Sequence, residues 1–141
     1  MSEQNKAIVR RFIDEAFNRR NLDGVGEFLH TDYCYHGSCG REAHGLDGVR
    51  QVIGMFLEAF PDLEVTVDDL LAGGDKVVTR WTARGTQKGA LMGMAPTGNR
   101  GTMSGIVISQ LKDGKVIEDW EQMDLLHLFQ QLGYAPTPAA P

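Results

Sequence analysis

The sequence predicts an α+β fold, with helices in the first half of the chain and an antiparallel sheet in the second. Apolar residues recur at helical spacing as far as Pro61 and alternate with polar residues from Leu63 onward. Helices followed by a run of strands are typical of α+β proteins. The 141 residues, 42% of them hydrophobic, fit a single domain spanning residues 1–141 that can bury its core without disulfides or metal.

Three helices are expected before the sheet, at residues 5–19, 22–29 and 46–60. Each carries apolar residues at the i, i+3, i+4 spacing of one helix face. Asn21 offers a capping side chain for the second helix. Pro61 ends the third, because the residue before a proline is pushed out of helical geometry.

Five strands are expected, at residues 33–36, 63–72, 75–85, 102–112 and 115–123. The sequences Gly73-Gly74-Asp75 and Asp113-Gly114 are turns that close hairpins between neighbouring strands. Residues 37–45 and 85–101 are expected to form loops, the second of them a flap over one end of the sheet. The proline-rich tail at residues 134–141 is expected to be loosely held.

The last strand carries the clearest sign of a ligand site. Because side chains alternate along a strand, one face of it carries Val116, Glu118, Trp120, Gln122 and Asp124. The other face carries Ile117, Asp119, Glu121 and Met123. The first face combines an aromatic ring with carboxyl and amide groups, which is more typical of a pocket wall than of a packed core.

The charge of the chain excludes some partners. A net charge of -5 and an isoelectric point near 5.3 argue against nucleic acid, because phosphate binding needs clustered Lys and Arg. No apolar run approaches the roughly 20 residues that span a bilayer, and the first residues lack the apolar segment of a signal peptide. We therefore expect no membrane partner and a cytoplasmic location.

Five blocks of the sequence form a pattern that covers most of the chain. They are the blocks at residues 60–71, 74–86, 96–98, 113–124 and 131–133. In this order they resemble the SnoaL-like polyketide cyclase (ester cyclase) family. The resemblance implies the nuclear-transport-factor-like (cystatin-like) fold, a cone-shaped α+β barrel in which a curved antiparallel sheet wraps around N-terminal helices and encloses a pocket.

The resemblance also implies a chemistry and an assembly. Family members with an established reaction close a ring of a polyketide ester by intramolecular aldol addition, with an aspartate as acid/base and with no metal or cofactor. The implied ligand is a hydrophobic small molecule, either polyketide-like or another carbonyl compound. The implied assembly is a homodimer, which also fits Ile117 and Met123, two apolar side chains expected on an exposed strand face.

The resemblance also assigns site residues. The family's Trp-x-x-x-Asp pattern falls on Trp120 and Asp124, and the histidine that commonly ends the first strand falls on His36. We predict Asp124 as the catalytic general base and His36 as a catalytic hydrogen-bond donor to the enolate. Gln87 stands where the family often has histidine, so any proton transfer by that histidine is reduced here or moved elsewhere.

The predicted ligand pocket consists of Trp120, Gln122, Glu118, Trp81, Arg80, Phe56 and Tyr33. Several site residues have structural alternatives. Asp124 could cap the final helix, and His36 could be a hydrogen-bonded core residue. The tryptophans could pack in the core, and Arg80 could be exposed to solvent.

Zinc is an alternative use of four residues. Cys34, His36, Cys39 and His44 are all zinc-competent and lie within eleven residues of one another. Their spacing contains no C-x-x-C pair, and two of them fall in a loop, so we predict no metal. We also predict no disulfide in a cytoplasmic protein.

Two function classes stay open at this point. One is an enzyme that performs cofactor-free proton transfer on a carbonyl compound, with a polyketide cyclase as its specific form and an epoxide hydrolase or isomerase as variants. The other is a non-catalytic binder of small molecules. A carboxylate with a raised pKa in an apolar pocket would favour the enzyme.

Overall fold

The computed structural model describes residues 2–134. The helices are α1 (Ser2–Ile13), α2 (Gly45–Ala59) and α3 (Leu125–Leu132), with a π-helical turn at Asp14–Asn18 and 3₁₀ turns at Asp23–Glu27 and Ser38–Gly40. The strands are β1 (Leu29–His36), β2 (Glu42–His44), β3 (Glu64–Gly73), β4 (Lys76–Thr86), β5 (Arg100–Lys112) and β6 (Lys115–Met123). Apart from Tyr134, the tail expected at residues 134–141 lies outside the described residues.

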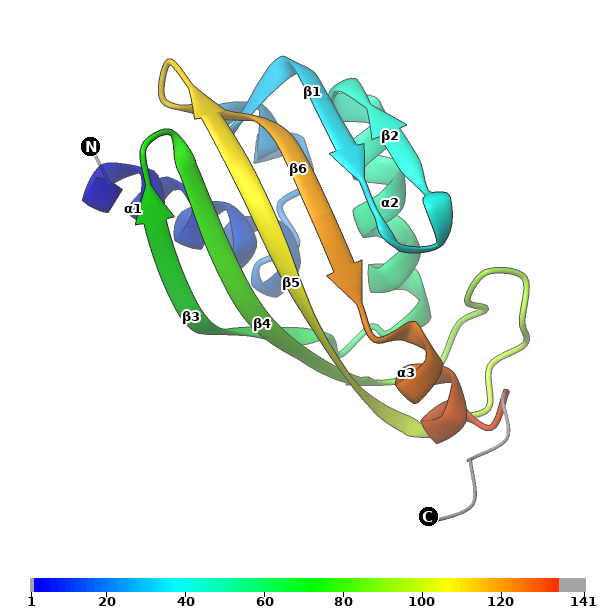
Figure 1. The fold of residues 1–141 in the computed structure, drawn as a ribbon. Coiled ribbons are helices and arrows are strands. Elements are labelled where there is room, and N and C mark those ends of the chain that lie inside the picture. Colours follow the sequence, from blue (N-terminus) through cyan, green and yellow to red (C-terminus); the bar gives the residue numbers. More distant parts are fainter. Residues whose placement is uncertain (1, 135–141) are drawn as a thin grey trace.

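The six strands form one sheet in the order β2-β1-β6-β5-β4-β3. The sheet curves, and both α1 and α2 lie on its concave side (Figure 1). α1 packs against β3 and β4, α2 packs against β1, and α3 packs against β5. This arrangement confirms the predicted α+β fold, in which N-terminal helices sit inside a curved sheet.

One strand pair departs from the predicted antiparallel sheet. β1 lies parallel to β6, with Tyr35 opposite Asp119 and His36 opposite Trp120, whereas the other pairs are antiparallel. No hairpin turn joins β1 to β6, so neither turn chemistry nor periodicity reveals their relative direction. The pairing brings the tyrosines of β1 next to the acidic residues of β6.

The remaining differences from the expected elements are local. The second expected helix is only a 3₁₀ turn, and its two glycines, Gly24 and Gly26, disfavour an α-helix. Strand β2 forms within the expected loop at 37–45 and pairs with β1. Asp113 and Gly114 both have positive φ, as a type I′ hairpin turn requires.

Within residues 2–134, no helix is long and apolar enough to cross a membrane.

A β-bulge at Ile117 changes the alternation along β6. In the β5–β6 ladder, Val116 lies opposite Leu111 and Glu118 lies opposite Gln110, which leaves Ile117 as an extra residue. Val116 is buried, as its apolar side chain predicts. Because one residue is added, every side chain after Ile117 points to the face opposite to the one that strict alternation assigns.

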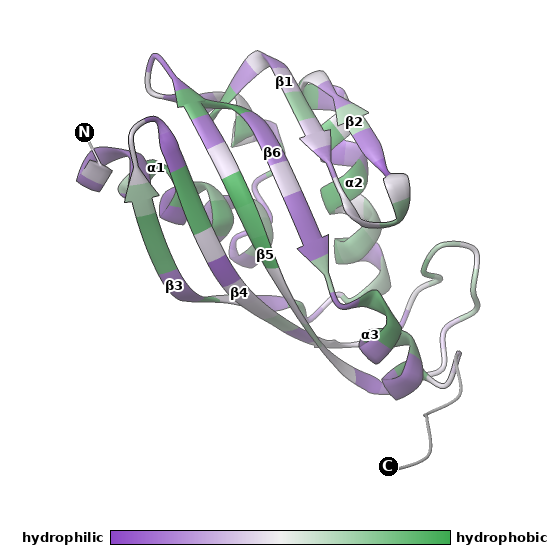
Figure 2. Ribbon diagram, viewed as in Figure 1, coloured by the Kyte–Doolittle hydropathy of each residue, from purple (hydrophilic) through white to green (hydrophobic). Residues whose placement is uncertain are grey.

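Because of the bulge, the residues of β6 that were predicted to form the pocket wall lie on the outer face instead. Asp119, Glu121 and Met123 face the helices and line the interior. Glu118, Trp120 and Gln122 lie on the outer face, where Trp120 is 38% exposed. Hydrophobic and hydrophilic segments interleave along the strands, as expected of a sheet with one buried face and one exposed face (Figure 2).

We expect Gly105→Ala to reduce the free energy of unfolding by about 1–3 kcal/mol, the usual cost of overpacking a core. A Cβ at Gly105 would lie 2.4 Å from Cζ2 of Trp81 and 2.9 Å from the backbone oxygen of Gln122. The indole cannot move away easily, because its Nε1 donates a hydrogen bond to Glu121. Urea denaturation measures the change.

The matched control for this substitution is Gly73→Ala, at the end of β3. A Cβ there would meet no atom within 4 Å, so the free energy of unfolding should change by less than about 0.5 kcal/mol. Equal losses in the two variants would show that the contact with Trp81 is not the cause.

Candidate active site

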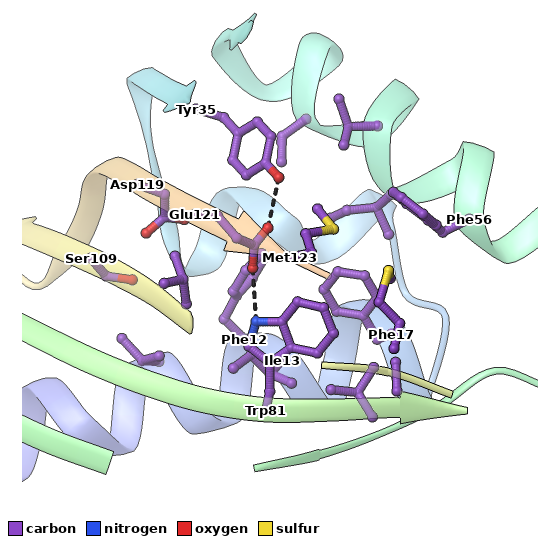
Figure 3. A pocket seen from close by; sticks show the side chains of 18 of the residues that line it. Phe12, Ile13, Phe17, Tyr35, Phe56, Trp81, Ser109, Asp119, Glu121 and Met123 are labelled. Atoms are coloured by element: carbon purple, nitrogen blue, oxygen red, sulfur yellow. Dashed lines mark hydrogen bonds between the residues drawn. The ribbon is translucent and has the colours of Figure 1, made fainter. Parts of the chain in front are cut away.

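A cavity lies between the concave side of the sheet and the helices (Figure 3). Its volume is about 90 Å³ for the centres of water-sized spheres, several times the roughly 10–15 Å³ that one water molecule needs. Most of its wall is apolar and includes Phe12, Ile13, Phe17, Phe56 and Met123. The polar groups come from β1, β4, β5 and β6, and they are Tyr33, Tyr35, Trp81, Ser109, Asp119 and Glu121.

Glu121 lies between Tyr35 and Trp81 in this wall (Figure 3). The Tyr35 hydroxyl donates a hydrogen bond to Oε1 at 2.6 Å, and Nε1 of Trp81 donates one to Oε2 at 2.9 Å. The side chain of Glu121 is only partly buried. Each carboxylate oxygen has two lone pairs, so Glu121 can still accept a proton or a hydrogen bond from a ligand.

Asp119 is the second acid of the cavity and is only 6% exposed. The Tyr33 hydroxyl donates a hydrogen bond to its Oδ2 at 2.6 Å. Among the described residues, its Oδ1 has no hydrogen-bond partner. A buried carboxylate oxygen without a partner is costly, so a ligand that donated a hydrogen bond to Oδ1 would be stabilised.

Burial raises the pKa of both acids. The pKa of Asp119 rises to about 6, although the nearby hydroxyl groups of Ser109 and Tyr33 oppose the rise. Burial raises the pKa of Glu121 to about 7, and the charge of Asp119 adds to this rise while hydrogen bonds from Tyr35 and Trp81 oppose it. Glu121 therefore exchanges a proton near neutral pH, where a general base is most effective.

The two tyrosines keep their protons over the same range. Burial raises the pKa of Tyr33 and Tyr35 well above the ordinary value, and the neighbouring carboxylates raise it further. Both phenols therefore act as neutral hydrogen-bond donors in the cavity. The arrangement combines a base, hydrogen-bond donors and apolar walls in one cavity.

The structure brings three of the predicted pocket residues together. Tyr33, Phe56 and Trp81 all line the cavity. Arg80 does not, because it is exposed on the outer face of β4, with Nη1 3.7 Å from Oδ2 of Asp68. With Glu118, Trp120 and Gln122, it belongs to the face opposite to the cavity.

His36 also lies on the outer face. Its Nε2 is 2.6 Å from Oε2 of Glu118, and its ring stacks on Trp120 at a centroid distance of 5.8 Å. The imidazole is therefore neither part of the cavity wall nor a buried core residue.

Asp124 is exposed at the end of β6 and caps α3. Its Oδ1 accepts a hydrogen bond from the backbone N–H of His127 at 3.1 Å. The cavity wall does not include it. This geometry matches the structural alternative for Asp124 and offers no path to a base role in the cavity.

We expect Asp124→Asn to retain the stability of the parent, because asparagine caps helices about as well as aspartate. It should also retain the turnover of any substrate that reacts in the cavity, because Asp124 lies outside the cavity wall. Asp124→Ala should reduce the free energy of unfolding by about 1 kcal/mol, because it removes the cap, and should also retain turnover. Thermal melts and initial rates measure both effects. A large loss of turnover in a folded Asp124→Asn variant would restore Asp124 as the base.

Gln87 has a structural position in the loop after β4. Its side chain is buried, and Nε2 donates to the backbone oxygen of Gly89 at 3.1 Å and to the Tyr134 hydroxyl. Its Oε1 accepts hydrogen bonds from the N–H and the hydroxyl of Thr97. The residue therefore ties this loop to the segment after α3 and does not line the cavity.

Sequence reasoning missed Tyr35, Asp119 and Glu121. Alternation along β6 assigned both acids to the face opposite to the pocket, and the bulge has no distinctive sequence. One signal was present: Tyr33 and Tyr35 alternate with polar residues on β1, which is the pattern of an inward-facing row of hydroxyl donors.

Known proteins resemble this chain over nearly its whole length. The family model described as SnoaL-like polyketide cyclase matches residues 7–132. The chain is 29% identical over 136 residues to the aklanonic acid methyl ester cyclase DnrD of Streptomyces peucetius, an alignment that covers 93% of this chain and 92% of that protein. It is 31% identical over 139 residues to the aklanonic acid methyl ester cyclase AcmA of Streptomyces galilaeus, with 94% and 92% covered.

A solved structure agrees with these matches. A protein from Jannaschia sp. CCS1 has a TM-score of 0.88 and 27% identity to this chain, with 97% of this chain and 96% of that chain covered. The chain belongs to the SnoaL-like polyketide cyclase family.

Proposed function

We propose that the protein is a cofactor-free cyclase that closes a ring in a hydrophobic, polyketide-like carbonyl compound by intramolecular aldol addition. One observation carries the proposal: in the apolar cavity, Glu121 has a pKa of about 7 and lies within hydrogen-bond distance of two donors, Tyr35 and Trp81. Two relatives with whole-chain similarity are named as aklanonic acid methyl ester cyclases, so the ligand class proposed here is a polyketide methyl ester.

Glu121 is the proposed general base. It removes a proton from a carbon flanked by carbonyl groups, a position acidic enough for a carboxylate when water is excluded. Asp119 is a poorer candidate, because it is more deeply buried and its pKa of about 6 is lower than that of Glu121.

Tyr35 is the proposed donor to the enolate oxygen. In the structure its single O–H proton is donated to Oε1 of Glu121 at 2.6 Å. When Glu121 takes up the substrate proton, the hydroxyl can rotate and donate to an enolate oxygen beside the carboxyl group instead. A neutral donor in a low-dielectric site stabilises the negative charge that develops on the oxygen. Trp81 holds the other carboxylate oxygen and fixes the orientation of the base.

The proposed reaction balances without a cofactor. The C–H electron pair becomes the enolate as the proton moves to Glu121. The enolate carbon then attacks a second carbonyl of the same molecule, which forms the new carbon–carbon bond and an alkoxide. Protonated Glu121 returns its proton to the alkoxide, so substrate and product are isomers and the enzyme is regenerated.

The test is ring closure measured by chromatography and mass spectrometry. Purified protein is incubated with aklanonic acid methyl ester and with smaller β-keto methyl esters. The expected result is a product of unchanged mass, altered retention and a single configuration at the new centre. A substrate that binds saturably and is never converted would favour the non-catalytic binder.

We also propose that the protein forms a homodimer through the outer face of the sheet. This face carries three exposed apolar side chains on the neighbouring strands β5 and β6. They are Ile106, Ile108 and Trp120, which are 50%, 39% and 38% exposed. Ile108 lies directly opposite Trp120 in the β5–β6 ladder. Met123 does not contribute to this surface, because it lines the cavity. Light scattering should give twice the monomer mass of 15.5 kDa, and Ile106→Glu should shift the mass toward the monomer.

A further inference from the structure

A cluster of Cys, His and Glu side chains spans three strands on the outer face of the sheet. Cys34 and His36 extend from β1, Glu118 from β6 and His44 from the end of β2. The ladders place Cys34 opposite both His44 and Glu118. All four side chains are on the face opposite to the active-site cavity, and the proposed reaction uses none of them.

Three of the four residues, Cys34, His36 and Glu118, have donor atoms close enough to share one ion, and the fourth, His44, contacts Cys34. Sγ of Cys34 lies 3.5 Å from Nε2 of His36 and 3.5 Å from Nδ1 of His44. One donor atom each from Cys34, His36 and Glu118 lies within 4.8 Å of the others. In tetrahedral zinc sites, bonds of about 2.3 Å to sulfur and 2.0–2.1 Å to nitrogen separate these atoms by about 3.5 Å.

Glu118 needs only a small adjustment to act as a ligand. Its Oε2 is 2.6 Å from Nε2 of His36, whereas oxygen and nitrogen ligands of one tetrahedral zinc ion lie about 3.3 Å apart. The side chain is 34% exposed, so it can move by this distance without disturbing the core. An ion between the two atoms would replace their hydrogen bond with two metal bonds.

Glu42 lies beside both imidazoles and is within hydrogen-bond distance of His36 alone. Oε1 of Glu42 lies 3.3 Å from Nδ1 of His36, and Oε2 of the same residue lies 3.7 Å from Nε2 of His44. Each histidine thus presents one nitrogen to Cys34 and the other to Glu42. Metal-bound histidines usually show this arrangement, with a carboxylate on the second nitrogen. Trp120 stacks on His36 at an interplanar angle of 15° and fixes its ring.

We propose that Cys34, His36, His44 and Glu118 form a zinc-binding site, with Glu42 as the outer partner of both imidazoles. One thiolate, two imidazoles and one carboxylate suit Zn²⁺ better than the harder Mg²⁺ or Ca²⁺. This set of residues differs from the zinc alternative in the sequence, because Glu118 takes the place of Cys39. An ion there would tie β2, β1 and β6 together at the edge of the sheet, with no part in ring closure.

The test uses full-length protein without an affinity tag, stripped with a chelator. Zn²⁺ affinity is measured in competition with a chromophoric chelator, and Co²⁺ absorption reports the ligands. We expect one ion per chain, tetrahedral Co²⁺ bands and a thiolate-to-cobalt charge-transfer band. Cys34→Ser should abolish that band and weaken zinc binding by more than the roughly 10–100-fold expected for Glu42→Gln.

Cys39→Ser is the matched control, because Cys39 is the second free cysteine and is exposed. It should keep the charge-transfer band and the zinc affinity of the parent, and circular dichroism should show that all variants are folded. Zinc should raise the Tm of the parent and of Cys39→Ser, but not that of Cys34→Ser. The proposal is overturned if the parent shows no charge-transfer band, or if Cys34→Ser binds zinc as tightly as Cys39→Ser.

Discussion

Glu121→Gln should lower kcat for ring closure by about 10²–10⁴-fold, the usual contribution of a general base. Glutamine has the same shape but cannot take up the proton. Its oxygen can still accept the hydrogen bond from Trp81, and its NH₂ group can donate to the Tyr35 hydroxyl, which can rotate to accept. The variant should therefore keep its fold and bind ligand while losing turnover.

Two variants serve as comparisons for this loss. Tyr35→Phe removes the proposed enolate donor and leaves the base, so kcat should fall less than in Glu121→Gln, by about 10²–10³-fold. Asp124→Asn should leave kcat unchanged. If Glu121→Gln turns over at the parent rate, the base lies elsewhere and the role proposed for the cavity acids is wrong.

Glu121→Gln should also stabilise the folded protein relative to the parent at alkaline pH. The folded-state pKa of Glu121, about 7, lies above its ordinary value of 4.5. Between these values the folded protein keeps a proton that the unfolded chain has released, so the free energy of unfolding falls as pH rises through this window. For Glu121 the loss is on the order of 3 kcal/mol at pH 8.

Urea denaturation at pH 4.5 and at pH 8 measures this effect as a difference between parent and variant. Glu121→Gln should match the parent at the lower pH and be more stable at the higher pH, because glutamine does not titrate. Glu64→Gln, at an exposed position of β3, controls for the loss of one acidic group. A difference between parent and Glu121→Gln that is the same at both pH values would contradict a raised pKa.

Periodicity and turn chemistry predicted most of the fold. The helical spacing ending at Pro61 located α2, and the Asp113-Gly114 turn located the β5–β6 hairpin. The parallel β1–β6 pair and the short β2 were not predicted, because both depend on contacts between segments that no local turn connects.

The candidate site was predicted less well, for a specific physical reason. Tyr33 and Trp81 were predicted for the pocket and line the cavity, whereas Arg80, predicted with them, alternates with Trp81 and lies on the outer face of β4. The extra residue at Ile117 reversed the faces of β6, so the acids of the inner face were taken for outer ones. Acidic residues are usually exposed to solvent, so sequence alone favours the outer face for Asp119 and Glu121. Their place on the inner face depends on hydrogen bonds from Tyr33, Tyr35 and Trp81 on neighbouring strands.

The role of Glu121 as general base is tested most directly by hydrogen exchange at the reacting carbon, because proton removal precedes ring closure. A β-keto methyl ester is incubated in D₂O with the parent, Glu121→Gln or Asp124→Asn, and deuterium uptake between the carbonyls is followed by NMR. If Glu121 is the base, uptake should be rapid with the parent and with Asp124→Asn, and should occur at the uncatalysed rate with Glu121→Gln. Parent-like uptake with Glu121→Gln, or none with the parent under conditions where the ester is bound, would contradict this role.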